Sequence, residues 1–154
     1  MLDAKLDSAA LNAAISKIEK RIPEMTDKVV RKLAFDGMRD IVVSITTGAF
    51  SNPIRVDTGR YRAAWGVGSQ ALGLGAVGPT SGALPGDGRG TVQKSGSVTT
   101  ATITNAVEYA EYVEFGTVHM EAGHHVQVAL QRVTEDGEDL IRSLIGPLFE
   151  SVNR

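Results

Sequence analysis

The chain has 154 residues, of which 42% are hydrophobic and 22% charged, with a formal net charge of −2. This composition is typical of one globular domain and excludes a disordered chain, while the slightly acidic balance argues against a dedicated nucleic-acid-binding domain. The sequence has no cysteine, which excludes disulfides and thiolate metal sites, and no apolar run approaches the roughly 18–20 residues that a membrane span needs.

The charges are unevenly distributed along the chain. Residues 1–62 hold eleven Lys and Arg against eight Asp and Glu, whereas residues 63–154 hold five against ten. Such an asymmetry is typical of a protein whose two ends meet different partners, although two solvated faces without partners would give the same counts.

The first third of the chain, residues 1–48, is predicted to be helical. Leucine and isoleucine recur every three to five positions from residue 2 to residue 22, and a second apolar stripe continues at the helical period to about Thr47. Gly48 is a suitable helix end. Because Pro23 interrupts the pattern, we expect either two helices or one long helix kinked at that proline.

Residues 63–107 are predicted to be a β-region that contains a long loop. Ahead of this region, Asp57 is placed to cap the one or two helical turns that follow it. Alternating apolar positions from Trp65 to Leu74 indicate a first strand. Residues 78–90 are rich in glycine and poor in core residues, which predicts a mobile loop. Two further strands, Thr91–Lys94 and Val98–Asn105, flank a turn at Ser95-Gly96.

The last third is predicted to contain a short helix at residues 108–116 and a long helix at residues 124–145, which Gly146-Pro147 should end. The expected order is therefore α–α–β–β–β–α in a single domain, residues 1–154. This is an α+β fold in which two N-terminal helices and a long C-terminal helix pack on a small antiparallel sheet with a long Gly-rich loop.

The densest group of aromatic and acidic residues is the segment VEYAEYVEFGT, residues 107–117. On a helix, Tyr109, Tyr112 and Val113 cluster on one side. The three glutamates, Glu108, Glu111 and Glu114, fall on the other. Carboxylates for acid–base catalysis must converge in a pocket, and glutamates along the outer face of one helix do not. We therefore interpret this segment as a packing face backed by a solvated or subunit-contacting face.

A second candidate site is Asp57-Thr58-Gly59, a tripeptide that also carries the catalytic aspartate of aspartic proteases. Because the chain has a single copy, such an enzyme would have to be a homodimer. A helix cap followed by a flexible glycine is the simpler interpretation.

Three other patterns give weaker indications of a site. The histidines His119, His124 and His125 lack the spacing of a metal motif, and a solvated loop is the better interpretation. The stretch GLGAVGPTSG lacks the lysine of a phosphate-binding loop. The alternation of basic and aromatic residues at Arg60–Trp65 could contact nucleic acid, but arginines flanking core aromatics explain it as well. No cofactor is predicted.

Two of these segments together carry a resemblance to a known family. VDTGRYR at residues 56–62, followed some fifty residues later by NAVEYAEYVEFGT at residues 105–117, resembles the small tail-component family of long-tailed bacteriophages, the tail-completion or head–tail joining proteins. The family pattern runs from a helical N-terminus through "V-D-T-G-x-L-R", a β-region and "Y-A-x-Y-V-E-x-G-T" to a C-terminal helix. The resemblance covers residues 6–145.

The sequence departs from the family pattern at three places. Tyr61 stands where leucine is usual, and Glu111 stands where proline is common. After Gly116-Thr117 the family shows "A-R-P-F-L-x-P-A-L", whereas this chain has AGHHVQVAL at residues 122–130. The missing prolines leave open where the last helix begins and which level of the neck the protein occupies.

The resemblance implies a non-enzymatic virion protein, made in the host cytoplasm, that forms a ring of six copies at the head–tail interface. Its partners would be the connector or adaptor, the tail terminator and the tail tube, and DNA would pass through the ring without sequence-specific contacts or any membrane involvement. Alternatives are a tail terminator or head-closure adaptor and, more remotely, the dimeric protease. The candidate interface residues are Asp57, Thr58, Gly59, Arg60, Tyr109, Glu111, Tyr112, Glu114, Gly116 and Thr117.

Overall fold

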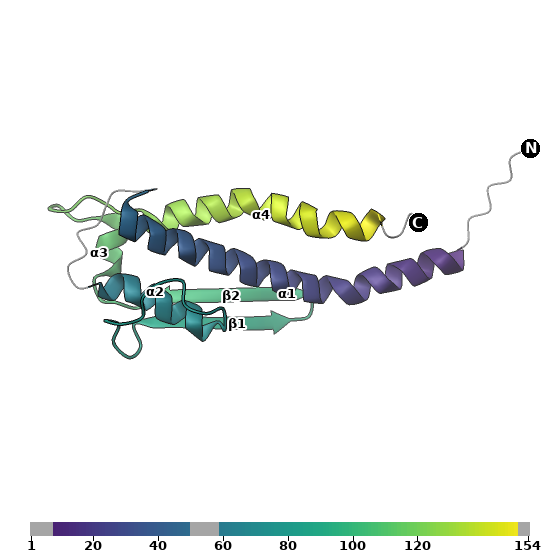
Figure 1. Cartoon of the computed structure of the whole chain (residues 1–154), viewed down its shortest axis with the longest axis horizontal. Coiled ribbons are helices and arrows are strands. Elements are labelled where there is room, and N and C mark those ends of the chain that lie inside the picture. Colours follow the sequence, from purple (N-terminus) through teal and green to yellow (C-terminus); the bar gives the residue numbers. More distant parts are fainter. Residues whose placement is uncertain (1–7, 50–58, 151–154) are drawn as a thin grey trace, which may run out of the picture.

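The computed structural model describes residues 8–49 and 59–150. Figure 1 shows an elongated molecule in which two long helices lie side by side and a β-hairpin and two short helices gather toward one end. The expected α+β class is confirmed, and in chain order the elements are α1 (Ser8–Thr47), α2 (Arg60–Ala71), β1 (Gly88–Ser95), β2 (Val98–Asn105), α3 (Ala110–Phe115) and α4 (His125–Glu150).

The N-terminal third is one helix of 40 residues, which settles the choice between one helix and two. Pro23 lies inside α1, where it removes one backbone donor without ending the helix. The helix ends at Thr47 as expected, because Gly48 has a φ of 66° and its N–H donates to the Ser44 carbonyl at 2.8 Å.

The strand expected from Trp65 to Leu74 is wrong, because residues 60–71 form α2. The alternating apolar positions suggested a strand because the residues between them are small. Ala63, Ala64, Gly66 and Gly68 are all buried against neighbouring elements, so this helix presents small residues where a strand would present polar ones. Tyr61 and Trp65, one helical turn apart, meet edge to face with ring centroids 6.1 Å apart.

The Gly-rich connection runs from residue 72 to residue 87, and β1 begins at Gly88, inside the range expected for the loop. Ser69 fastens the first half of the connection, because its hydroxyl lies 2.7 Å from the Gly75 carbonyl and accepts from the Val77 N–H at 3.1 Å. Gly78 lies against Val42 of α1, so closely that a Cβ there would come within 2.8 Å of a valine methyl. The mobility expected of residues 78–90 stays a prediction.

Within residues 8–49 and 59–150 the sheet has two strands, not the three expected. β1 and β2 pair antiparallel over their full length, from Gly88 opposite Asn105 to Ser95 opposite Val98. Along β2, Ala101 and Ile103 face inward and their neighbours along the strand are exposed.

The C-terminal helix extends to Glu150, and the break expected at Gly146-Pro147 is wrong. This helix packs mainly along α1, not on the sheet as expected (Figure 1). Gly37 of α1 meets Val133 and Gly137 meets Leu33, so a glycine on each helix lets the two backbones approach.

The core lies where α1, α2, α3 and α4 converge. It comprises Ile41, Val42, Ile45, Tyr61, Trp65, Val113 and Ala129. Because these residues come from four helices, α3 and the start of α4 are fixed in place by the same packing that holds α1 on α2.

Packing of the Gly-rich connection on α2 gives a testable difference between two helical glycines. A Cβ at Gly66 would lie 2.5 Å from the Pro79 carbonyl oxygen, whereas one at Gly146 meets nothing within 4 Å. We expect Gly66→Ala to lower the free energy of unfolding by about 1–3 kcal/mol.

The matched Gly146→Ala should change it by less than about 0.5 kcal/mol, because the better helix propensity of alanine is offset by the contact of its Cβ with the ring of Pro147. Urea unfolding followed by circular dichroism measures both changes. Equal effects in the two variants would show that the connection does not press on α2.

Candidate functional site

Arg60, the first residue of α2, is the centre of an ion-pair network. Its Nε and Nη2 donate to Oδ2 and Oδ1 of Asp87 at 2.7 and 2.8 Å, and its Nη1 donates to Glu108 at 2.8 Å. This two-pronged geometry is the strongest that arginine makes with a carboxylate. It joins the start of α2 to the end of the Gly-rich connection and to the segment before α3.

Asp87 is held for this role by its own backbone. Its carboxylate accepts from the Leu84 N–H at 2.7 Å, and its carbonyl accepts from the Ala106 N–H at 2.7 Å. The side chain is 5% exposed. Hydrogen bonds from Arg60 and from the Leu84 amide, together with the positive charge of Arg60, lower the pKa of Asp87 to about 2.

A second link joins the two sequence segments that carry the resemblance. The Asn105 side-chain amide donates to the Tyr61 carbonyl at 2.9 Å, and its oxygen accepts from the Val107 N–H at 3.2 Å. Together with the Arg60–Glu108 bond, it places Arg60 and Tyr61 of the first segment against the start of the second. The residues described from these segments therefore build the fold at this end of the molecule.

The expectation that Glu114 belongs to an outer face is wrong. Glu114 is 7% exposed, and its carboxylate accepts backbone N–H groups of Val126 and Gln127, each at 3.1 Å. It therefore caps the N-terminus of α4, where unpaired amides and the helix dipole favour a negative charge. Sequence periodicity could not show this, because the partner lies on another helix.

Ser44 and His125 form a buried polar pair between α1 and α4. Ser44 Oγ lies 2.8 Å from His125 Nδ1, and the two residues are 1% and 0% exposed. Burial lowers the pKa of His125 despite the attraction of the nearby Glu114, and His124 adds to the lowering. A serine and histidine enclosed in this way cannot reach a substrate, so the pair is structural.

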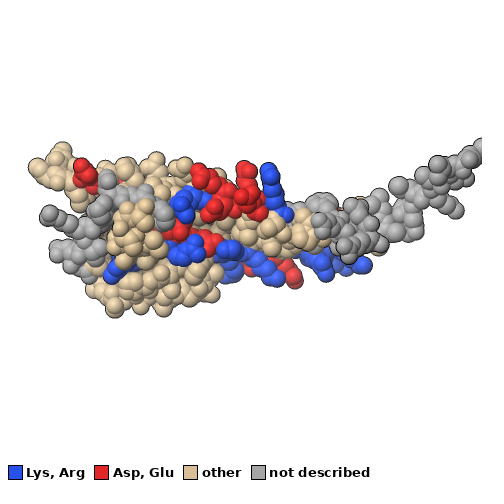
Figure 2. Space-filling model, turned by 45° about the horizontal axis from the view of Figure 1, so that its top comes forward, with Lys and Arg blue, Asp and Glu red and all other residues tan. Residues whose placement is uncertain are grey.

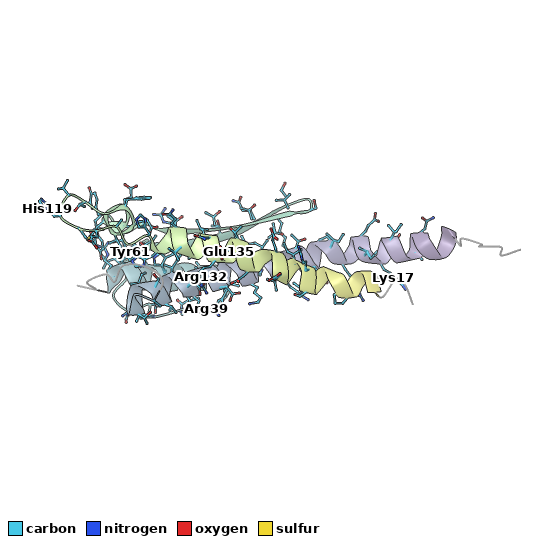
Figure 3. All side chains as sticks on the ribbon, turned by 90° about the horizontal axis from the view of Figure 1, so that it is seen from above. Lys17, Arg39, Tyr61, His119, Arg132 and Glu135 are labelled. Atoms are coloured by element: carbon cyan, nitrogen blue, oxygen red, sulfur yellow. The ribbon has the colours of Figure 1, made fainter. Side chains whose placement is uncertain are left out.

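An exposed apolar surface lies at the α3 end, and we call it the apolar tip. It consists of Tyr112, Phe115, Val118 and Met120, which are 58%, 72%, 94% and 41% exposed. Tyr112 was expected to pack inward, but α3 is short and only Val113 and Glu114 of it are buried. Figure 3 shows His119, which lies between Val118 and Met120 in the sequence, at the end of the molecule.

The remaining residues of the segment shape this tip. Tyr109 is half-buried against the core, as expected, and Glu111 is exposed. Gly116 has a φ of 76°, and a Cβ there would meet the Met120 carbonyl at 2.7 Å. Thr117 and Met120 then exchange backbone hydrogen bonds of 2.8 and 3.2 Å, which closes the loop that carries Val118.

An apolar groove adjoins the tip. Two neighbouring hollows, of about 450 and 600 Å³, lie between α4 and β2; α1 provides the floor of the first, and α2 and α3 complete the lining of the second. Trp65, Ile103, Val126 and Leu130 line both hollows, so they form one groove. Leu130 is 61% exposed there, which is unusual for a large side chain that faces so many apolar neighbours.

Other candidates from the sequence are placed as follows. Asp57 and Thr58 lie outside the described residues, whereas Gly59 adopts a φ of 70° and caps α2 without a side chain. His119 and His124 are exposed, and no group of three potential ligands for a metal ion occurs in residues 8–49 and 59–150. Tyr61 and Trp65 are 6% exposed and serve the core, so they are not free to stack on bases.

Sequence reasoning missed Asp87 and Ser44. Asp87 stands between two glycines, Gly86 with a φ of 92° and Gly88 pressed against α2. A carboxylate between glycines in an otherwise apolar loop indicates a sharp backbone path and a buried charge. Ser44 carries no such signal, because its partner is 81 residues away.

The comparisons with known proteins gave one match. The model of the family described as "Bacteriophage HK97-gp10, putative tail-component" matches residues 9–116, more than two thirds of the chain. No curated protein and no solved structure matched. In the described parts of its helices, the chain has no segment long and apolar enough to cross a membrane.

The Arg60–Asp87 pair predicts an acid-dependent loss of stability. Because the pKa of Asp87 is about 2 in the folded protein and 3.8 ordinarily, its contribution is complete above about pH 4 and disappears as the pH falls towards 2. Asp87→Asn should be less stable at neutral pH and should lose less between pH 4 and 2. Urea unfolding across this range measures both, with exposed Asp139→Asn as control; parallel profiles for wild type and Asp87→Asn would contradict the assignment.

His125 predicts a second, separate pH effect. Its pKa is lowered from 6.5 in the folded protein, so the unfolded chain binds a proton more readily and stability falls as the pH drops below about 6.5. We expect urea midpoints, read from Trp65 fluorescence, to decrease from pH 7.5 to pH 5.5 in the wild type and in His119→Gln. His125→Gln should lose this decrease, and a retained decrease would assign it elsewhere.

Proposed function

The chain belongs to the HK97 gp10-like family of bacteriophage tail components, and we propose that it is the structural subunit of a ring at the head–tail interface. In this position the ring completes the tail, joins the tail tube to the head connector and lets DNA pass. The family match is the observation that carries the proposal. It covers α1, α2, the β-hairpin and α3, which are the elements that the Arg60 network and Asn105 hold together.

The exposed apolar surfaces support an assembly role. The apolar tip and the groove leave Phe115 and Leu130 more than half exposed, and monomeric proteins rarely expose contiguous apolar surface of this kind. A subunit that is buried between neighbours in a virion would cover them. Tyr112 and Glu111 on the same helix offer the polar groups that accompany aromatic anchors at interfaces.

Closed-ring geometry fits a chain with two unlike ends. A ring requires that one face of each subunit meets a different face of the next, and six copies are proposed by analogy with the family pattern. The two faces of such a ring would meet unlike partners. These partners are the connector or adaptor on one side and the tail terminator or tube on the other.

Passage of DNA requires a channel that does not bind phosphates strongly. Strong phosphate binding comes from Lys and Arg side chains without acidic partners, and Arg60 is instead neutralised by Asp87 and Glu108 of its own chain. The role proposed is also non-enzymatic, which accords with a family of tail components and with the enclosed position of Ser44 and His125.

The test is assembly with a variant of the apolar tip. Tyr112→Asp/Phe115→Asp should fold normally, because both side chains are exposed, but should fail to form rings or to join heads to tails. If the two aromatics are interface anchors, self-association weakens at least about 30-fold. Leu84→Asp, which changes an apolar residue of similar exposure in the Gly-rich connection, is the control.

Negative-stain images of the protein, alone and on tails from particles that lack it, measure the outcome. Rings at the tail end that faces the head support the proposal. A density band at the tube terminator or directly beneath the connector portal would assign the protein to the neighbouring roles of tail terminator or head-closure adaptor. Monomers in solution and no binding to tails would contradict the ring altogether.

A further inference from the structure

The N-terminal part of α1 is a helix with an uncovered apolar stripe. We call residues 12–22 the α1 arm; Figure 1 shows that this end of α1 projects past the end of α4. Ile15 and Ile22 lie two helical turns apart on one side and are 43% and 45% exposed. No hydrogen bond or ion pair links the arm to another element among the residues that the structure describes.

Such an arm needs a partner. Isolated helices of this length are marginally stable in water, and most helical stability in proteins comes from packing of an apolar face. The arm is also basic, with Lys17, Lys20 and Arg21 against the single acidic Glu19. Its complement is therefore an apolar surface with an acidic border.

The groove between α4 and β2 has these properties. Its lining is apolar, with Met38 and Ile41 in the floor and Leu130 exposed on the wall. Glu111 lines one end of the groove, whereas the acidic run of α4 at Glu135, Asp136, Glu138 and Asp139 lies outside its lining. Figure 2 shows a group of acidic side chains on the body, with basic side chains beside it and along the side that leads to the arm.

The arm cannot enter the groove of its own chain. Leu33 lies opposite Gly137 in the antiparallel pair of α1 and α4, and Ile15 and Leu130 lie in opposite directions from that point. At 1.5 Å per residue they are roughly 37 Å apart along the helices. Any contact between arm and groove therefore joins two copies.

We propose that the α1 arm of one copy docks in the apolar groove of the next, with Ile15 and Ile22 on Leu130 and the arm's Lys and Arg facing Glu111 at the end of the groove. The contact joins two different faces, so its repetition from copy to copy gives a ring or a filament, whereas two copies that exchange arms reciprocally would stop at a dimer. It rests on the proposed function, since it specifies how neighbouring subunits of the proposed ring hold one another. The mode is that of an amphipathic helix in a groove.

Cross-linking tests the contact directly, because the chain has no cysteine of its own. The variant Ile15→Cys/Leu130→Cys, assembled in solution and on tails from particles that lack the protein, is treated with a short bismaleimide. We expect a ladder of covalent oligomers on a denaturing gel. The control Ile15→Cys/Leu84→Cys has the same arm cysteine and an equally exposed second one outside the groove, and should give no ladder.

Charge exchange provides an independent readout. Lys17→Glu/Lys20→Glu/Arg21→Glu should weaken self-association measured by analytical ultracentrifugation. Combination with Glu111→Lys should restore part of it, which a merely structural defect would not allow.

The outcomes separate this inference from the proposed function. Rings without the ladder, or a ladder of equal strength in the control, overturn the docking of arm in groove and leave the ring intact. Only monomers, in solution and on tails, overturn the proposed ring and the inference with it.

Discussion

The pair between Arg60 and Asp87 is the interaction on which this end of the molecule depends. It fixes the first turn of α2 to the last residue of the Gly-rich connection, and through Glu108 it reaches the segment that leads into α3. Since Ala106 donates to the Asp87 carbonyl, the end of β2 is tied to the same point. The position of α3, and with it the capping of α4 by Glu114, follows from this junction.

The residues that a sequence comparison singles out therefore serve two different purposes. Arg60, Asn105 and Glu114 are turned inward and hold elements together, whereas Tyr112 and Phe115, interleaved with them, are turned outward. The inward residues explain why the two motif segments, about fifty residues apart, occur together in one sequence. The outward set leaves the surface that assembly would use, and α4, which the family match does not reach, supplies one wall of the adjoining groove.

Periodic apolar patterns predicted the elements that have one buried side. The end of α1 at Thr47 and the bounds of β2 were predicted from the sequence pattern. The sequence pattern did not predict the burial of residues whose partners lie far away in the sequence. Small residues of α2 such as Gly66 are buried because a loop and a strand press on them, which local sequence does not encode. Glu114 was expected at the surface because a helical wheel of α3 does not include its partners, the amides at the start of α4.

Hydrogen exchange of the free protein and of the protein assembled on tails tests the central claim, that one side of the motif region builds the fold and the other builds the ring. The account predicts that amides around Asp87 and Ala106 are equally protected in both states, because the chain alone satisfies them. The arm at residues 12–22 and the tip at residues 116–120 should gain protection only on assembly. Protection that appears on assembly around Asp87 and Ala106, with arm and tip unchanged, would contradict the account.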